Sequence, residues 1–593
     1  MTAVTSNDQP PRSLLAGFSI FMLALMCVLP FLSPYHMPPI ASFYNEWAAA
    51  LLAVFASLFL IGQRQDNLQI PVITFVPLGL MGVLGLQIAL GMPDYWQNQF
   101  VAMLYLGLSA LLMILAANLR HTVSLEKIVP GIAWAFVVGA TCIMILLPIG
   151  KLLPDEHALA KWILDSKSGN IGQVNHFSNY LALGLASLLY LRMSGRVNTL
   201  ITVLIAGLIL LGFAQGGQRM AILYVALLAF GGWFLGRTVS QNQSTAMKPT
   251  ALLWLIPGFI LAQLIVPMLA FLEPSKMPAE RLAQTLGSES SRLLLIDQAW
   301  NLFRQHPWLG AGWAEFSWYN FTVTEAYPSL KGLWHHAHNL VLQLLAETGI
   351  VGAMILTGGM LYWFREQFLN TMTAERWWLL ALLSVIGIHS MLEYPLWYMT
   401  FLAIASLLLG LGSERPLQIR FQLAPVFFLV IFIFSAWSMG NMLTSYQQLE
   451  TTLTSLREEG LPQSEIDKNL EKLHQLRETS VFTPVADNFL VRVLPNQPAL
   501  IKDKLTISQQ VIENWPGRVE TYTHAYLLAM NNQPVAAQKM VRMAIKQFPE
   551  YREAYHRFVL AQVVKRQENA LLPILIILQD PYQASESELG IDE

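Results

Sequence analysis

Three of the twelve histidines in the chain lie within four positions, as His335, His336 and His338. They stand where a long polar stretch ends and a strongly apolar segment begins. A neutral imidazole titrates near neutral pH, so a histidine here could act as a general base that takes the proton of a hydroxyl group. We expect this short stretch to mark the site of chemistry.

A polar stripe continues from the histidines as Asn339, Gln343 and Glu347, each four residues apart. On a helix this spacing puts the three side chains on one face, and the other faces carry leucine, valine and isoleucine. A carboxylate at membrane depth is costly, so it usually faces a cavity or a partner. The stripe is therefore either a polar seam below the histidines or a set of hydrogen bonds to neighbouring helices.

Clustered histidines also suggest a metal site, because zinc accepts imidazole and carboxylate ligands. Such a site needs three or four converging ligands, and only the three histidines and Glu347 could converge here. The two cysteines, Cys27 and Cys142, lie inside apolar runs and have no ligand spacing. We favour the general base over a metal site and expect no cofactor.

Two arginines have the chemistry of phosphate ligands. Arg219 opens an apolar segment, and Arg292 lies in a stretch near residues 290–300 that has the pattern of an amphipathic helix. Arginine stays charged in any protein site, and its planar fork matches phosphate oxygens. Arg219 could instead anchor to lipid headgroups, Arg292 could form an ordinary salt bridge, and Arg281 is a weaker candidate.

The composition indicates a polytopic membrane protein. Apolar residues make up 54% of the chain and charged residues only 12%, against about 25% charged in soluble proteins. The net charge of -2 gives no indication of partners, and we expect no nucleic acid among them. Residues 215–219 are glycine-rich but lack the strand and spacing of a nucleotide-binding loop, which argues against a nucleotide-driven pump.

Apolar runs long enough to span a bilayer recur along the first three-quarters of the chain. They predict an all-α fold with about thirteen transmembrane helices, and the segments 47–62 and 396–412 are the shortest of them. The predicted helices lie near residues 13–32, 47–62, 71–91, 100–118, 128–150, 174–193, 197–214, 218–236, 250–271, 339–364, 376–392, 396–412 and 421–440.

The short connections between these helices alternate in charge. One set carries most of the lysine and arginine, and the other set, which includes 33–46, 92–99 and 393–395, has none in these stretches. Basic connections are typical of the cytoplasmic side, so we expect a cytoplasmic N-terminus. An odd number of helices then puts the histidines, Arg219 and everything after residue 440 on the opposite, periplasmic side.

The tail from 441 to 593 is charged and helix-patterned. A repeat at an offset of 33 residues matches Pro516, Glu520, Tyr522 and Leu527 with Pro549, Glu553, Tyr555 and Leu560. Helix-turn-helix repeats of the tetratricopeptide type have about this length. We therefore divide the chain into N-terminal transmembrane helices (1–271), a long periplasmic loop (272–338), C-terminal transmembrane helices (339–440) and a periplasmic helical domain (441–593).

Several of these segments resemble known families. The stretches 336–339 and 347–352, 306–312 with the preceding Arg292, and Gln218-Arg219 resemble the motifs of the O-antigen ligase and polymerase superfamily. Four further segments resemble the bacterial protein O-oligosaccharyltransferases that glycosylate pilins. These segments are Pro34 to Pro39, Gly169 to His176, His389 to Tyr398 and the helical tail.

The resemblance implies a GT-C-like membrane enzyme of the bacterial inner membrane. Such an enzyme moves an oligosaccharide as a block from undecaprenyl pyrophosphate to a serine or threonine of a periplasmic protein such as a type IV pilin. It implies no metal and no nucleotide sugar, and its partners are the lipid-linked donor, the acceptor protein and membrane lipids. An O-antigen ligase acting on the lipid A core, an O-antigen polymerase and a membrane transporter are the alternatives.

The resemblance also implies roles for single residues. His338 takes the hydroxyl proton, with His336 as the second choice, and Arg219 and Arg292 hold the pyrophosphate. Glu393 or Glu347 orients the histidine or binds the acceptor. The supporting residues that complete the expected site are Asn175, His176, Gln173 and Asn339.

Overall fold

The computed structural model describes residues 10–62, 67–152, 169–269, 291–458, 460–494, 496 and 500–579. Arg281 and the first part of the predicted loop, 272–290, lie outside these residues. The described chain is helical almost throughout, which confirms the all-α prediction. Its strands are β1 (Leu68–Ile70) and β2 (Leu417–Ile419), which pair antiparallel with Leu68 opposite Ile419.

The chain forms two compact units, and each is built from three separate stretches. Unit 1 contains Met1–Met81, Leu104–Glu289 and Met354–Gly440. Unit 2 contains Gly82–Met103, Ser290–Ala353 and Asn441–Glu593. The four predicted segments follow the order of the chain, whereas these units group segments by their packing.

A helix is present at each of the thirteen predicted spans. Ten helical segments of the described chain are long and apolar enough to cross a membrane, so the protein is a multi-pass membrane protein. The remaining three predicted spans are α9 (Val174–Met193), which begins with polar residues, and the shorter helices α18 (Ala374–Ser390) and α19 (Met399–Gly412).

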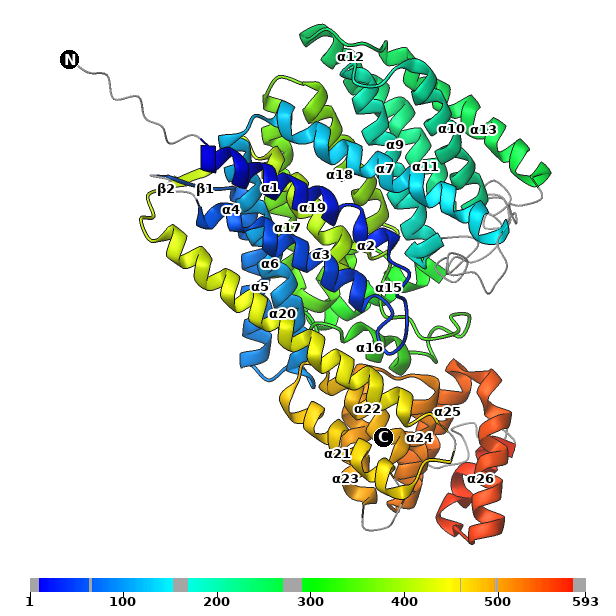
Figure 1. Cartoon of the computed structure of the whole chain (residues 1–593). Coiled ribbons are helices and arrows are strands. Elements are labelled where there is room, and N and C mark those ends of the chain that lie inside the picture. Colours follow the sequence, from blue (N-terminus) through cyan, green and yellow to red (C-terminus); the bar gives the residue numbers. More distant parts are fainter. Residues whose placement is uncertain are drawn as a thin grey trace. The chain divides into compact units, whose positions relative to one another are not determined.

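The helices of unit 1 appear in blue, cyan, teal to green (α9 to α13) and yellow-green in Figure 1. Besides α9, α18 and α19 they are α1 (Pro10–Met26), α2 (Leu29–Leu32), α3 (Phe43–Ala56), α4 (Leu58–Ile61), α7 (Leu125–Leu152), α10 (Thr199–Gly216), α11 (Met220–Ala226), α12 (Gly232–Asn242) and α13 (Leu255–Ile265). Four more, α5 (Phe75–Ala89), α6 (Trp96–Thr122), α17 (Leu340–Leu369) and α20 (Ala424–Ser455), have residues in both units.

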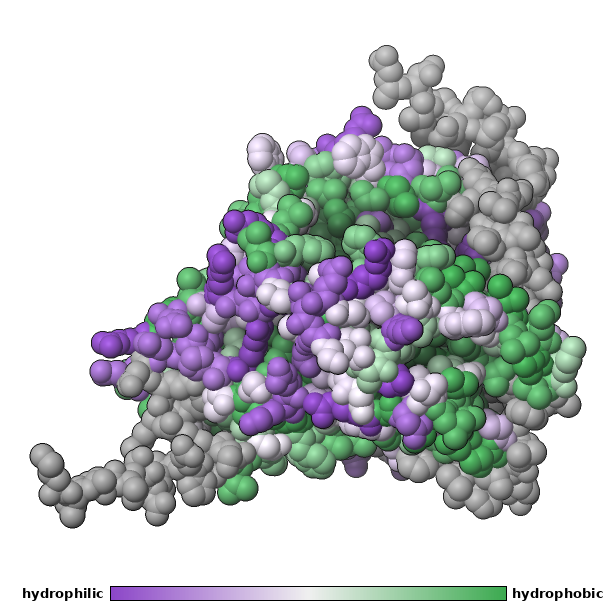
Figure 2. Space-filling view, turned by 90° about the horizontal axis from the view of Figure 1, so that it is seen from above, coloured by the Kyte–Doolittle hydropathy of each residue, from purple (hydrophilic) through white to green (hydrophobic). Residues whose placement is uncertain are grey.

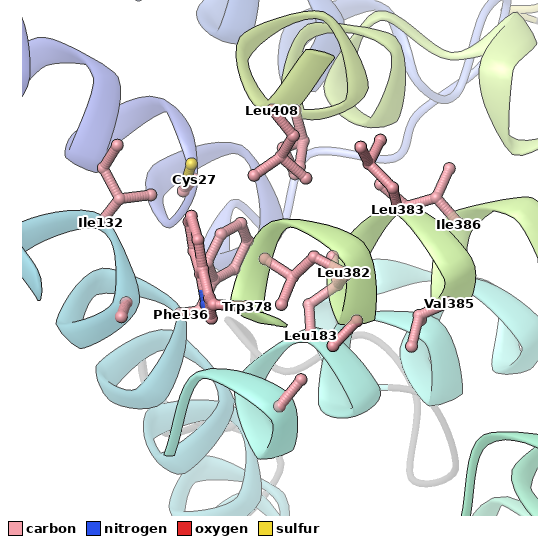
Figure 3. Close-up of a cluster of buried hydrophobic side chains, with 14 of the residues drawn as sticks. Cys27, Ile132, Phe136, Leu183, Trp378, Leu382, Leu383, Val385, Ile386 and Leu408 are labelled. Atoms are coloured by element: carbon pink, nitrogen blue, oxygen red, sulfur yellow. The ribbon is translucent and has the colours of Figure 1, made fainter. Parts of the chain in front are cut away.

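The centre of unit 1 is α9, which packs against α7, α10 and α18. A Cβ atom added at Gly184 would lie 2.5 Å from Ala140 Cβ, so α9 and α7 approach closely because this residue has no side chain. The Trp378 indole donates a hydrogen bond to Ser187 Oγ at 2.9 Å. Figure 3 shows the buried side chains of this centre, with Leu183 beside residues of α18.

The basic connections of unit 1 meet at one end of its helices. Arg120 and Arg376 both form ion pairs with Glu414, and the pairing of β1 with β2 joins a further connection, the one between α4 and α5, to the connection that carries Glu414. Asn242 donates to Met372 O at 3.1 Å. On the face drawn in Figure 2, hydrophilic residues extend from the left edge to the middle, and hydrophobic residues lie mainly on the right and in the upper part. The connections that were assigned to one side of the membrane by their basic residues therefore also contact one another.

Unit 2 includes the helices of the tail, and its helices are drawn in green and in yellow to red in Figure 1. They are α15 (Ser291–Gln305), α16 (Phe316–Thr322), α21 (Gln463–Thr479), α22 (Thr483–Val493), α23 (Ile501–Asn514), α24 (Arg518–Met530), α25 (Pro534–Gln547), α26 (Arg552–Arg566) and α27 (Leu572–Gln579).

The repeat positions of the tail contact one another. The rings of Tyr522 and Tyr555 lie 4.6 Å apart, and Tyr555 Oη donates to Tyr522 O at 2.6 Å. Tyr522, Tyr526 and Tyr555 are 1%, 3% and 6% exposed. These side chains pack between the helix pairs, so they hold the repeats together and offer little surface to a partner.

Candidate functional site

The histidines lie in an irregular loop of unit 2, residues 331–339, that leads into α17. Side-chain amides hold its backbone, since Trp334 N–H donates to Asn320 Oδ1 at 3.1 Å and Ala337 N–H donates to Gln343 Oε1 at 2.7 Å. Asn339 Oδ1 accepts from Leu342 N–H at 3.1 Å, as a residue before a helix often does. The loop therefore has a fixed path, although it has no regular structure.

His338 has a φ of 54°, in the left-handed region that non-glycine residues rarely adopt. Such a conformation costs about 1–3 kcal/mol and persists only where the surrounding structure imposes it. The ring of His338 meets the Trp334 ring edge-on, with centroids 5.4 Å apart. The His335 ring stacks on Trp515 of the tail, with centroids 4.0 Å apart.

Burial keeps two of these histidines neutral. It lowers the pKa of His335 to about 4 and that of His336 to about 3, and the neighbouring His335 and His338 add to the effect on His336. A pKa this far below neutral also makes these two imidazoles weak bases at neutral pH. The structure brings all three rings into one loop and leaves the assignment of the base to His338 or His336 as a prediction.

The predicted polar stripe lies at the start of α17. Asn339 precedes α17, and Gln343 and Glu347 lie in its first part, where both are 1% exposed. The helix is interrupted at Gly349, which has a φ of 66° and a ψ of -167°. The helix of the predicted span 339–364 is therefore present but kinked, and the stripe ends just before the kink.

Two glycines explain the interruption. A Cβ atom at Gly349 would lie 2.2 Å from Trp308 O, and one at Gly310 would lie 2.2 Å from the carbonyl carbon of Glu347. The stretch 307–312 thus crosses the start of α17 with the two backbones in contact. The buried Gln87 of α5 donates to both Leu309 O and Glu347 O at 2.7 Å, which fastens the crossing.

The polar side chains of the stripe are bonded to backbone groups of the same unit. Gln343 holds Ala337 of the histidine loop, as described above, and Glu347 Oε1 accepts from Phe316 N–H at 3.5 Å. Gln87 was not predicted, and Gln343 was predicted only as a member of the stripe and not as a support of the histidine loop. A lone glutamine within the apolar run 71–91 was a usable signal for Gln87, because an uncharged polar side chain in such a run needs a partner.

Helix α15, which carries Arg292, packs against the histidine loop. Leu295, Ala299 and Leu302 of this helix share one hydrophobic cluster with Ala337 of the loop and Ala346 of α17. Arg292 lies in the first turn of α15 and is partly exposed. Unit 2 therefore contains a cationic side chain and the histidines on neighbouring elements.

Three of the segments that carry the resemblance converge in unit 1. His36 Nε2 donates to Asn170 O at 2.6 Å, and Asn175 Nδ2 donates to Glu393 Oε1 at 3.0 Å. The His176 ring lies 5.4 Å from His389 and 4.7 Å from Tyr398, both edge-on. Segments near residues 36, 175 and 393 thus form one polar and aromatic cluster.

Arg219 lies in the same unit, directly before α11. Gly217, with a φ of 65°, ends α10 and lets the chain turn before Arg219. Helix α11 packs on α9, where Asn179 Nδ2 donates to Tyr224 Oη at 3.3 Å. Gln173 precedes α9, and its carbonyl accepts from Phe177 N–H at 2.9 Å.

The predicted site residues thus fall into two groups. Unit 1 contains Arg219, Gln173, Asn175, His176 and Glu393, and unit 2 contains Arg292, His336, His338, Asn339 and Glu347. In the described chain no group of three or more histidine, cysteine, aspartate or glutamate side chains has a geometry that could hold a metal ion.

Two family models match the chain. Residues 176–357 match the model described as O-antigen ligase, and residues 377–562 match the model described as virulence factor membrane-bound polymerase, C-terminal. The general O-oligosaccharyltransferase of Acinetobacter baylyi is 26% identical over 446 residues, which are 72% of this chain and 74% of that protein. The ComP-specific O-oligosaccharyltransferase of the same organism is 23% identical over 397 residues, 65% of this chain and 70% of that protein.

Proposed function

Since the chain belongs to the O-antigen ligase superfamily, we propose that it is a glycosyltransferase that moves a glycan from a lipid-linked donor to a hydroxyl group of a protein. Both relatives are named O-oligosaccharyltransferases, and this supports the proposed activity. The donor in this proposal is an oligosaccharide on undecaprenyl pyrophosphate, which moves as a block. The acceptor is a serine or threonine of a periplasmic protein such as a pilin.

The observation that carries the proposal is the packing of α15 on the histidine loop. One hydrophobic cluster joins the helix of Arg292 to the segment that contains His336 and His338. A cation on a helix that packs against the histidine loop is suited to holding a phosphate group while a histidine takes a proton. The same residues lie within the match to the O-antigen ligase model.

The proposed reaction is a single displacement. The acceptor oxygen attacks the anomeric carbon of the donor, and the bond between that carbon and the pyrophosphate oxygen breaks. The electron pair leaves with the lipid pyrophosphate, and the hydroxyl proton passes to a histidine of the loop. Because pyrophosphate is already a good leaving group, the protein must mainly hold it, neutralise it and present the hydroxyl.

The roles of the side chains follow from their chemistry. Arg292 and Arg219 bind pyrophosphate oxygens and stabilise the negative charge that develops there. His338 is the proposed base, with His336 as the alternative. Glu393, which accepts a hydrogen bond from Asn175, binds the acceptor. Glu347 instead accepts a hydrogen bond from the backbone N–H of Phe316.

The proposed location is the inner membrane with the histidine loop facing the periplasm. The clustering of basic connections at one end of unit 1 supports this orientation, because such connections are retained in the cytoplasm. A reporter that is active only in the periplasm, fused after residue 445, should be active. Activity of a cytoplasmic reporter at the same position would contradict the orientation.

The test of the activity is co-expression of the full chain with a lipid-linked glycan and a pilin. We expect a slower-migrating pilin whose intact mass is greater by the mass of one glycan. An unchanged pilin mass, in cells where other proteins also carry no glycan, would contradict transfer to protein.

The match to the polymerase model favours a second candidate, the joining of glycan units to one another. A polymerase lengthens lipid-linked glycan in cells that contain no acceptor protein, whereas a protein glycosyltransferase does not. Glycan found on lipid A alone would instead identify a ligase. The three outcomes are separated by analysing pilin, lipid A and lipid-linked glycan from the same cells.

A further inference from the structure

A buried amide of the tail is bonded to the loop that carries the histidines. Gln547, at the end of α25, is 2% exposed. Its Nε2 atom donates to Gly332 O, and its Oε1 atom accepts from Thr324 Oγ1 at 2.9 Å. Gly332 lies three residues before His335, so this bond fixes the backbone where the chain enters the histidine loop.

The bond belongs to a continuous buried chain of amides. Asn320 of α16 accepts from Trp334 N–H at 3.1 Å and donates to Gln298 Oε1 of α15 at 2.9 Å. Gln547 Nε2 lies 3.4 Å from Asn320 Oδ1. Gln298 and Asn320 are 0% and 2% exposed. One chain of hydrogen bonds therefore links the helix of Arg292, the entry to the histidine loop and the tail.

A second contact joins the tail to the loop itself. Trp515, which follows α23, stacks on the His335 ring at an interplanar angle of 15°. Ser317 Oγ of α16 donates to Asn514 O at 3.1 Å, next to this tryptophan. The tail thus contacts the loop region both at Gly332 and at His335, from two different helices.

We propose that the tail is part of the scaffold of the histidine loop and that Gln547 is a positioning residue for the transfer reaction. The inference rests on the proposed function. A buried donor or acceptor that loses its partner is destabilising, so removal of this amide shifts the loop until its groups find other partners. A displacement of about 1 Å at a reacting group can lower a rate about 100-fold.

Binding of the acceptor by the repeats is a different role, and the geometry favours the scaffold. The tyrosines Tyr522, Tyr526 and Tyr555 are used between the helix pairs of the tail. The buried contacts of Gln547 instead reach Gly332 of the loop, Asn320 of α16 and Thr324 just after that helix. Substitution of a scaffold residue alters kcat, the rate at which the bound substrates react. Substitution of an acceptor-binding residue alters KM for the acceptor.

Gln547→Leu in the full chain removes the amide and keeps a similar volume. We expect kcat for transfer to pilin to fall about 10-fold to 100-fold, with little change in KM for the lipid-linked donor or for the pilin. The matched control is Gln538→Leu in the same helix, because Gln538 donates to Pro573 O inside the tail at 3.2 Å. This control should retain the wild-type kcat while showing a similar loss of thermal stability.

A second pair of variants tests the other contact. Trp515→Ala removes the ring that stacks on His335, and Trp515→Phe retains an aromatic ring there. The alanine variant should lose rate and the phenylalanine variant should recover most of it. Equal kcat in Gln547→Leu and Gln538→Leu, or a raised acceptor KM with kcat unchanged, would overturn the scaffold role.

Amide hydrogen exchange gives a readout that does not depend on the reaction. Residues 332–338 should exchange faster in Gln547→Leu than in Gln538→Leu. If the wild-type protein modifies no protein acceptor, the proposed function fails, while this exchange experiment still decides whether Gln547 holds the loop. Unchanged exchange in 332–338 would contradict the inference whatever the activity is.

Discussion

The two polar clusters of the molecule are held in different ways. In unit 2, amide side chains bond to backbone groups, as Gln343 does with Ala337 and Gln547 with Gly332. Amides of unit 2 also bond to one another, as Asn320 does with Gln298, whereas in unit 1 the amide of Asn175 donates to a carboxylate, that of Glu393. Substitution of a supporting residue should therefore move the backbone in unit 2 and change the polarity of the cluster in unit 1.

The largest expected effect is at the histidine loop of unit 2. His338→Ala should abolish glycan transfer to pilin, because the proton of the acceptor hydroxyl then has no base, while the protein accumulates normally. His306→Ala is the control, since that histidine is exposed on the same unit. Retained transfer in His338→Ala with loss in His336→Ala would move the base to His336.

Substitution at the backbone crossing of residues 307–312 with α17 should have nearly as large an effect, because it destabilises the fold. In Gly349→Ala the new methyl group would lie 2.2 Å from Trp308 O, and alanine rarely adopts the backbone conformation of this residue. We expect a destabilisation of about 1–3 kcal/mol or more and lower membrane accumulation, measured by quantitative blotting and thermal unfolding.

Gly358→Ala is the matched control for the crossing, because nothing lies within 4 Å of a Cβ atom at that position of the same helix. It should accumulate like the wild-type protein. Normal accumulation of both variants would show that the crossing tolerates a side chain.

The arginines test whether a cation is needed in both units. Arg292→Lys and Arg219→Lys should each lower the transfer rate about 10-fold, and alanine should lower it further, because lysine cannot bind phosphate oxygens in a bidentate way. Arg304→Lys, at the exposed end of α15, should change little. Full activity of both lysine variants would exclude a bidentate clamp.

The smallest expected effect is the response of unit 2 to pH. The folded-state pKa of His335 lies near 4, below the value of 6.5 in the unfolded chain. The unfolded state therefore binds more protons between these values, and the folded state loses stability as the pH falls from about 6.5 towards 4.

His335→Phe removes this titration and keeps a ring against Trp515, so its thermal stability should fall less on going from about pH 7 to about pH 5. The measurement is thermal unfolding of the two purified proteins at both pH values. An equal loss in both would assign the acid sensitivity to other groups.

Much of the fold was predictable because apolar runs report directly on burial in a membrane. All thirteen predicted spans contain helix, and the repeat of 33 residues corresponds to a contact between Tyr522 and Tyr555. The histidine loop and Arg292 were found from residue type and position alone, and the structure brings their elements together. Their roles stay predictions.

The remainder depends on contacts between distant segments. The break at Gly349 follows from its contact with residues near 308, and a single glycine in an apolar run does not reveal such a contact. Likewise, Tyr95 donates to Asp487 at 2.9 Å and Gln97 to Thr483 at 3.0 Å. These bonds join the stretch 82–103 to the tail, and no local pattern predicts which partner a polar side chain will find.

The discontinuous make-up of unit 2 has a consequence for the order in which the chain is synthesised. The ribosome completes Gly82–Met103 and the histidine loop long before it reaches Gln547. Until then, the carbonyl of Gly332 and the side chain of Asn320 lack one hydrogen-bond partner, the side-chain amide of Gln547. A nascent chain that has already inserted its helices therefore still lacks part of the support of its histidine loop, and a chain truncated before Gln547 should insert into the membrane but, if the proposed function holds, should not transfer glycan.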